Sequence, residues 1–121
     1  MDIYFLISIF HIVCIVPFFA YIFIQKAATP DFVYNILFFL GLFVLVYHGY
    51  KSYIKYMSGS PYLWVNLYHL SAVAPLMIYI GYEGKKTPTP AYEGLGLMTF
   101  AALGYHLYHI VVLANVHNEN D

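Results

Sequence analysis

The segment HIVCIVPFFAYI, residues 11–22, places a histidine and a proline inside an otherwise apolar run. Both are unfavourable there, because a buried imidazole needs a polar partner and a proline removes a helix hydrogen bond. The segment HLSAVAPLMIYI, residues 69–80, repeats the arrangement 58 residues later and aligns both residues without a gap. The recurrence indicates that the histidine and the proline have a common role in the two segments.

The same register extends over most of the chain. At an offset of 58, thirteen positions carry the same residue in both halves. In the first half they are Tyr4, His11, Pro17, Tyr21, Ile22, Thr29, Pro30, Tyr34, Leu37, Leu45, Tyr47, His48 and Tyr50. A shared apolar composition does not explain matched histidines and prolines. We infer that residues 4–57 and 62–115 are two copies of one helical hairpin, followed by a polar tail over residues 115–121.

The composition predicts a membrane protein. The chain has 121 residues, of which 62% are hydrophobic and 9% are charged, whereas soluble domains carry about 25% charged residues. Apolar runs at residues 3–24, 33–53, 61–82 and 91–114 each reach the roughly 20 residues that a transmembrane helix needs. We therefore predict an all-α, integral membrane four-helix bundle, with residues 1–121 forming a single transmembrane domain in the lipid bilayer.

Four spans place both termini on the same side of the membrane, and two copies with an even number of helices insert the same way up. The copies are then expected to be related by a pseudo-two-fold axis along the membrane normal. In each copy the proline, Pro17 or Pro75, is predicted to kink the first helix. The lysines divide three against two between the sides, a bias too small to predict which side faces the cytoplasm.

Four histidines are expected to share one layer of this bundle. His11, His69, His48 and His106 fall about 4–8 Å from the bilayer centre at a rise of 1.5 Å per residue. All four lie on the side of the termini, because the second and fourth helices run antiparallel to the other two. Ionisable side chains in a membrane avoid lipid. The four imidazoles are therefore predicted to point into the bundle.

The first functional hypothesis is b-type haem for electron transfer. A pair of neutral imidazoles on two helices can ligate one iron from both sides. His11 with His69 is the first choice for the haem iron, and His48 with His106 is the alternative pair. The chain has no arginine, so Lys51 or Lys55 would have to meet the haem propionates.

Other hypotheses remain open. Four imidazoles in one layer could hold a zinc, copper or iron ion without haem. A structural role is the main alternative to haem, with each imidazole bonded to a tyrosine, to Ser8, Asn66 or Ser71, or to a backbone carbonyl. The chain would then be an accessory subunit of a larger organellar or viral membrane assembly, or a homo-oligomer. Histidines and tyrosines could also form a proton or ion conduit.

Several function classes are disfavoured. A net charge of −1 with only five basic residues gives no reason to expect a nucleic-acid partner. Cys14 is the single cysteine, so the chain has neither a disulfide framework nor a CxxC motif. No nucleophile with an adjacent base is visible. The sequence therefore favours an electron-transfer or accessory membrane protein over a stand-alone enzyme.

Overall fold

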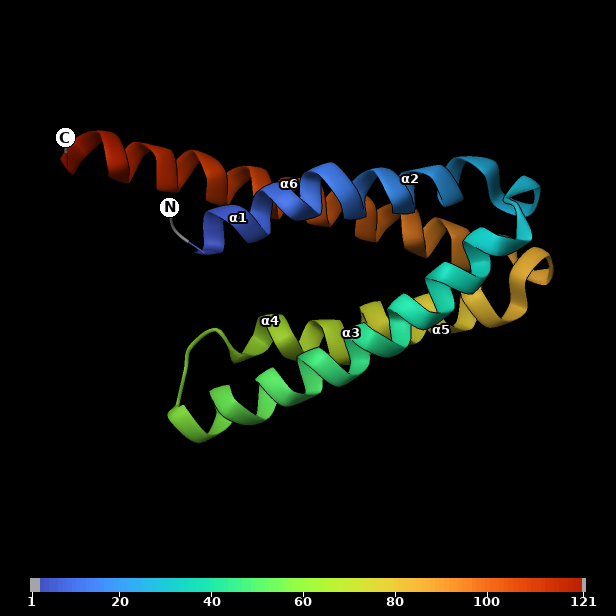
Figure 1. Ribbon diagram of the computed structural model, residues 1–121, viewed down its shortest axis with the longest axis horizontal. Coiled ribbons are helices and arrows are strands. Elements are labelled where there is room, and N and C mark those ends of the chain that lie inside the picture. Colours follow the sequence, from blue (N-terminus) through green and yellow to red (C-terminus); the bar gives the residue numbers. More distant parts are fainter. Residues whose placement is uncertain (1–2, 121) are drawn as a thin grey trace. The chain divides into compact units, whose positions relative to one another are not determined.

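The structure is a computed structural model that describes the backbone of residues 3–120 and the side chains of residues 3–115. Its elements are all helical, and no strand occurs among the described residues (Figure 1). The predicted all-α class is therefore confirmed. The side chain of His117, in the predicted polar tail, lies outside the described part.

Four long helical stretches make up residues 3–120. The first comprises α1 (Ile3–Phe10), a π-helical segment (His11–Ile15), α2 (Val16–Gln25) and a 3₁₀ turn (Lys26–Ala28). The second is α3 (Asp31–Ser58). The third comprises α4 (Leu63–Tyr68), a π-helical segment (His69–Val73), α5 (Ala74–Glu83) and a 3₁₀ turn (Gly84–Lys86). The fourth is α6 (Thr89–Asn120), which continues into the residues predicted as a polar tail.

All four stretches are long and apolar enough to cross a membrane. The candidate spans are Ile3–Ala28, Asp31–Ser58, Leu63–Lys86 and Thr89–Asn115. Each begins within two residues of its predicted start and ends up to five residues beyond its predicted end. Apolar runs bounded by proline, glycine and lysine thus located the helices correctly.

The two π-helical segments begin at the matched histidines and end just before the matched prolines. The N–H of Val16 bonds to the carbonyl of His11, and the N–H of Ala74 bonds to that of His69, both five residues back. Pro17 has no N–H with which to continue the ordinary ladder, and Pro75 likewise has none. A wide π turn therefore precedes each of the two prolines at which a kink was predicted.

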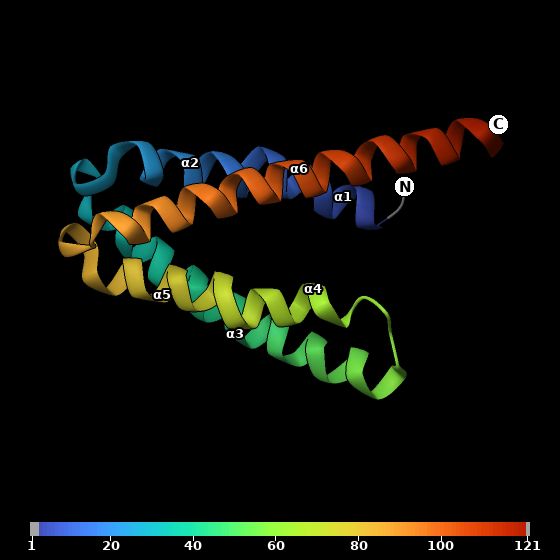
Figure 2. The same cartoon turned by 180° about the vertical axis from the view of Figure 1, so that it is seen from behind.

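The chain divides into two compact units. Unit 1 is Met1–Ile24 with Glu93–Asp121, and unit 2 is Gln25–Tyr92. In unit 1, α1 and α2 pack against α6, and in unit 2, α3 packs against α4 and α5 (Figures 1 and 2). The hairpins 4–57 and 62–115, and a single domain over residues 1–121, remain predictions.

Each unit has one close helix contact in which a glycine faces a phenylalanine. In unit 2, a Cβ added to Gly81 would lie 2.6 Å from the Cα of Phe38. In unit 1, a Cβ added to Gly96 would lie 2.6 Å from Cε2 of Phe23. Positions 23 and 81 correspond at the offset of 58, as do 38 and 96, so the two units exchange the large and the small residue. Close approach of the helices depends on glycine at both sites.

Buried positions recur at the same offset. Pairs of residues that are 9% exposed or less occupy equivalent positions in the two halves. These pairs are Ser8 and Asn66, Val16 and Ala74, Phe19 and Met77, Ile22 and Ile80, Thr29 and Thr87, Tyr34 and Tyr92, Leu37 and Leu95, and Gly41 and Thr99. The repeated sequence pattern therefore corresponds to a repeated pattern of burial.

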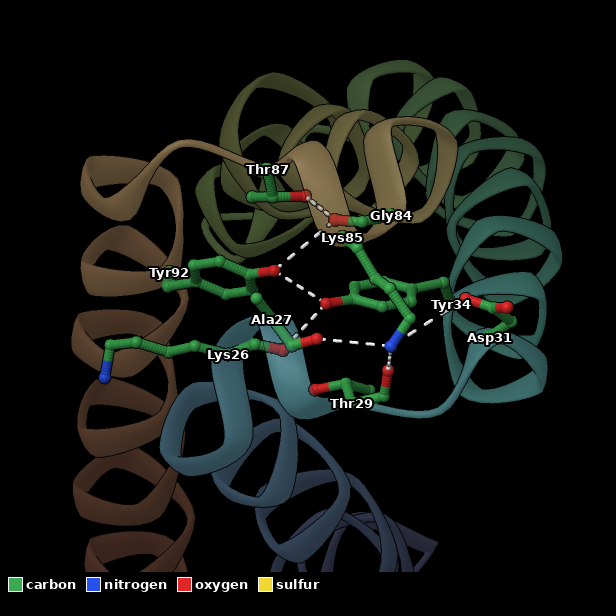
Figure 3. Close-up of polar contacts among 9 residues, drawn as sticks. All are labelled: Lys26, Ala27, Thr29, Asp31, Tyr34, Gly84, Lys85, Thr87 and Tyr92. Carbon is green, nitrogen blue, oxygen red and sulfur yellow. Dashed lines mark hydrogen bonds and ion pairs between the residues drawn. The ribbon is translucent and has the colours of Figure 1, made fainter.

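Two connectors lie in unit 2: the 3₁₀ turn Lys26–Ala28 with the two residues after it, and the 3₁₀ turn Gly84–Lys86 with the two residues after it. A polar network around a tyrosine pair joins them (Figure 3). The hydroxyl of Tyr34 donates to the carbonyl of Lys26 at 2.7 Å and lies 2.6 Å from the hydroxyl of Tyr92. The hydroxyl of Tyr92 also lies 3.4 Å from the carbonyl of Gly84. Lys26 and Gly84 are equivalent positions, and both have a positive φ, of 49° and 59°. These bonds fix the connectors at one end of the hairpin.

Lys85 adds a second link between the connectors. Its Nζ donates to the carbonyls of Ala27 at 3.2 Å and Thr29 at 2.8 Å. The same Nζ lies 4.0 Å from Oδ1 of Asp31, at the start of α3 (Figure 3). The ammonium group thereby satisfies two carbonyls that have no helical partner at the chain reversal.

Candidate functional site

In unit 1 the predicted site residues His11 and His106 form a stacked pair. The ring centroids lie 4.3 Å apart with an angle of 19° between the planes. His106, on α6, is buried, and its Nδ1 lies 3.2 Å from the hydroxyl of Ser8 on α1. The two contacts together join the first and last helical stretches of the chain.

Unit 2 contains the equivalent pair, His48 and His69. Their centroids lie 4.0 Å apart with an angle of 6° between the planes. The side-chain Nδ2 of Asn66 donates to Nδ1 of His48 at 2.8 Å. Asn66 is 4% exposed, and its Oδ1 is buried with no hydrogen-bond partner among the described residues. Asn66 corresponds to Ser8, and His48 corresponds to His106, so each unit places one polar side chain beside the same histidine of the repeat.

His11 and His69 each make a hydrogen bond to a backbone carbonyl, and this bond fixes the tautomer of the ring. Nδ1 of His11 lies 2.7 Å from the carbonyl of Ile7, and Nδ1 of His69 lies 2.7 Å from that of Val65. A carbonyl only accepts, so Nδ1 carries the proton in both rings. In a neutral imidazole the other nitrogen, Nε2, then bears the lone pair. In both histidines Nε2 is thus the nitrogen with the lone pair, the form that a base or a metal ligand requires.

The π turns place these histidines on the packed face of their helices. Val16, Phe19 and Ile22 form the buried face of α2, and His11 precedes Val16 by five residues. In a regular α-helix, residues five apart point about 140° apart. The wider π turn brings His11 close to the direction of Val16. The same step of five separates His69 from the buried Ala74.

The contacts differ from the ligand pairs chosen from the sequence. His11 stacks on His106 and His48 stacks on His69, whereas the chosen pairs were His11 with His69 and His48 with His106. Each chosen pair has one member in each unit, so those pairs remain predictions. Ser8 and Asn66, considered as polar partners from the sequence, do contact histidines, whereas Ser71 bonds to the carbonyl of Leu67.

The described residues form no group of three or more metal-ligating side chains. His109, one turn beyond His106, packs against Tyr105 with centroids 4.5 Å apart. A zinc or non-haem iron site with three or four protein ligands therefore finds no support here. Haem needs only one or two imidazoles, because the macrocycle supplies the other four ligands, and a neutral imidazole with Nδ1 bonded to a carbonyl suits that role.

Comparison with protein-family models, curated proteins and solved structures found no match to this chain. Any function therefore has to be inferred from the residues themselves.

Proposed function

We propose that the chain is an integral membrane protein that crosses the bilayer four times and binds b-type haem for electron transfer through its helix histidines. The observation that supports it most is the matched pair of 2.7 Å bonds from Nδ1 of His11 and His69 to backbone carbonyls. Such a bond fixes the tautomer, orients the ring and makes Nε2 a stronger ligand.

His11 and His69 are the iron ligands of first choice, and His48 and His106 are the alternative. Nδ1 of His48 accepts a hydrogen bond from Nδ2 of Asn66, so Nε2 carries the proton in the neutral ring. That tautomer does not suit ligation through Nε2. His48 instead holds the ring of His69 by stacking at 4.0 Å, and His106 holds the ring of His11 in the same way. When bound, haem would supply one-electron redox chemistry.

The proposal of four membrane crossings rests on the helices themselves. Each candidate span has at least 24 residues, which exceeds the roughly 20 that cross the hydrocarbon core. Large apolar side chains are exposed along all four, including Val46, Leu97 and Phe100. Contact of these side chains with lipid chains costs no free energy, whereas their contact with water is unfavourable. An even number of crossings puts both termini on one side.

We also propose that residues 4–57 and 62–115 arose as two copies of one hairpin. The repeated π-helical segments, the repeated buried positions and the repeated bonds of Nδ1 in His11 and His69 support it. Thirteen identities at one offset would be unexpected if the halves had separate origins.

The haem proposal is tested by measuring bound haem per protein in a series of single variants expressed with excess haem precursor. His11→Ala and His69→Ala are expected to lose the haem. His109→Ala is the matched control, because this histidine lies on α6 but contacts Tyr105 instead of a second histidine. Loss of haem in His48→Ala and His106→Ala, but not in His11→Ala and His69→Ala, would assign the iron to the alternative pair.

A structural, accessory role is the second candidate, and the stacked pairs favour it. Each pair joins two helices within its unit, and interhelical polar contacts contribute about 0.6–2 kcal/mol in membranes. In that case the wild-type chain is colourless, and replacing any of the four histidines lowers the unfolding temperature of the detergent-solubilised protein. Its partners would be other membrane subunits or further copies of the chain.

A further inference from the structure

The last turns of α3 carry an unbalanced pair of positive charges. Lys51 and Lys55 lie one helical turn apart, and both are half-buried, so their side chains extend over the same face of α3. The sequence contains no acidic residue between Asp31 and Glu83. Unit 2 therefore has no carboxylate near these two ammonium groups at the C-terminal end of α3. At the opposite end, Lys85 has Asp31 at 4.0 Å.

The length of α3 would place these lysines at the level of the lipid headgroups. Its 28 residues extend about 42 Å at 1.5 Å per residue, whereas the hydrocarbon core of a bilayer is about 30 Å thick. Tyr50, Tyr53 and Tyr56 expose their rings around the lysines. Tyrosines with nearby lysines are typical of the membrane–water interface.

A buried hydroxyl lies on the same turn. Ser52 is 8% exposed, and its Oγ has no hydrogen-bond partner in the part of the chain that the structure describes. Lys55 lies three positions after Ser52, so the two share a face of α3. The site thus combines two cations with a hydroxyl that can donate to an oxygen anion.

We propose that Lys51, Lys55 and Ser52 form a binding site for the phosphate of an anionic phospholipid. A lysine ammonium is a compact charge that suits a phosphate oxygen, and an anionic lipid supplies the negative charge that unit 2 lacks at this end. The proposal rests on the membrane-spanning part of the proposed function and does not require haem, although it assigns to lipid the two lysines that could otherwise meet the haem propionates. Lysines near a helix C-terminus also stabilise the helix by interacting with its dipole, but this stabilisation does not depend on the lipid headgroup.

The chain contains its own reporter for this site. Trp64 is the only tryptophan, and it is exposed on α4. A Cβ on Gly41 would meet Ile78, and a Cβ on Gly49 would lie 3.7 Å from Leu70. On the other side of the π-helical segment, Asn66 bonds to His48, so Trp64, two residues before Asn66, lies near the level of Tyr50 and Lys51 in the antiparallel pairing. Lipid bound at the two lysines would therefore lie close to the indole.

The test measures quenching of Trp64 fluorescence by brominated lipids in vesicles containing the full chain. Brominated phosphatidylglycerol in unbrominated phosphatidylcholine is compared with brominated phosphatidylcholine at the same mole fraction. The wild-type protein is expected to prefer phosphatidylglycerol by about fivefold for each lysine. Lys51→Gln/Lys55→Gln is expected to remove the preference, and Lys51→Arg/Lys55→Arg to keep it. Lys86→Gln, at the other end of the hairpin, is the matched control.

Three results would overturn the proposal. One is equal quenching by both lipids in the wild type, and another is an undiminished preference in the double glutamine variant. The third is loss of the preference on adding inorganic phosphate, but not chloride of equal ionic strength, which would assign the site to soluble phosphate. Absence of quenching by either lipid would instead contradict the membrane-spanning proposal itself. A colourless protein with a clear preference would leave the lipid site standing and contradict only the haem.

Discussion

The hydroxyl oxygens of Tyr34 and Tyr92 lie 2.6 Å apart at equivalent positions of the repeat. Their other bonds are unequal. Tyr34 donates to the carbonyl of Lys26 at 2.7 Å, whereas Tyr92 lies 3.4 Å from the carbonyl of Gly84, which also accepts from the hydroxyl of Thr87 at 2.6 Å. The two tyrosines are therefore not interchangeable for stability.

Replacing Tyr34 with phenylalanine should destabilise the protein more than the same change at Tyr92. Tyr34→Phe removes the short bond to Lys26 and the partner of the Tyr92 hydroxyl, an expected cost of about 1–3 kcal/mol. Tyr92→Phe leaves the bond to Lys26 in place and is expected to cost about 1 kcal/mol or less. Thermal unfolding of both variants in detergent measures the order. Equal losses would show that the shared contact outweighs the carbonyl bonds.

Alanine at three glycines should give a graded loss of stability. A Cβ at Gly81 would meet the backbone of Phe38 at 2.6 Å, whereas a Cβ at Gly96 would meet only the ring of Phe23. A ring can move and a helix backbone cannot, so Gly81→Ala is expected to cost about 1–3 kcal/mol and Gly96→Ala less. A Cβ added to Gly104 would meet nothing within 4 Å. Gly104→Ala is therefore the control, expected to be neutral or to stabilise by up to about 1 kcal/mol.

The same two glycines explain a helix pairing that the histidine pattern alone could not predict. The repeat makes His48 and His106 equivalent as partners of His11, so the pattern of histidines alone does not identify the helix that it meets. The residue sizes do break this equivalence. Gly96 opposite Phe23 and Gly81 opposite Phe38 fit together, whereas Phe23 opposite Phe38 would leave two large residues in conflict. Residue size, unlike the histidine pattern, therefore distinguishes the two possible partner helices.

The positions of the helices were predictable because each helix is a long apolar run, and because proline, glycine and lysine residues mark where each run begins and ends. The π turns were not predicted, although a kink at each of the two prolines was. Pro17 indicates a missing hydrogen bond, but whether the helix then kinks or widens depends on how its face packs. Here packing of His11 together with Val16 requires the wider turn. The partners Ser8 and Asn66 were visible as polar residues, and only the offset of 58 relates them.

The two connector positions with positive φ, Lys26 and Gly84, should respond unequally to substitution. Gly84 has φ 59° and ψ −131°, a conformation that is strained for any residue with a Cβ. Gly84→Ala is expected to destabilise the protein by about 1–2 kcal/mol. Lys26, with φ 49°, already bears such strain, so Lys26→Gly should change stability by less than about 1 kcal/mol. A larger loss in Lys26→Gly than in Gly84→Ala, measured by thermal unfolding, would contradict this account.

Removing a proline should displace the polar partner of the histidine pair. Pro17→Ala restores an N–H for the carbonyl of Val13 and favours a regular α-helix, which would rotate Ser8 away from His106. The measurement is disulfide formation in Ser8→Cys/His106→Cys on a Cys14→Ala background. The yield is expected to fall when Pro17→Ala is added, and the same cross-link with Pro30→Ala is the control. An unchanged yield would show that packing, and not the proline, maintains the π turn.

The absorption spectrum of the detergent-purified wild-type protein, expressed with ample haem supply, tests the central proposal most directly. If His11 and His69 ligate haem iron through Nε2, the spectrum will show a sharp Soret band that shifts on reduction with dithionite. A protein that purifies folded and colourless would contradict the proposal, and the histidine pairs would then serve only to join helices.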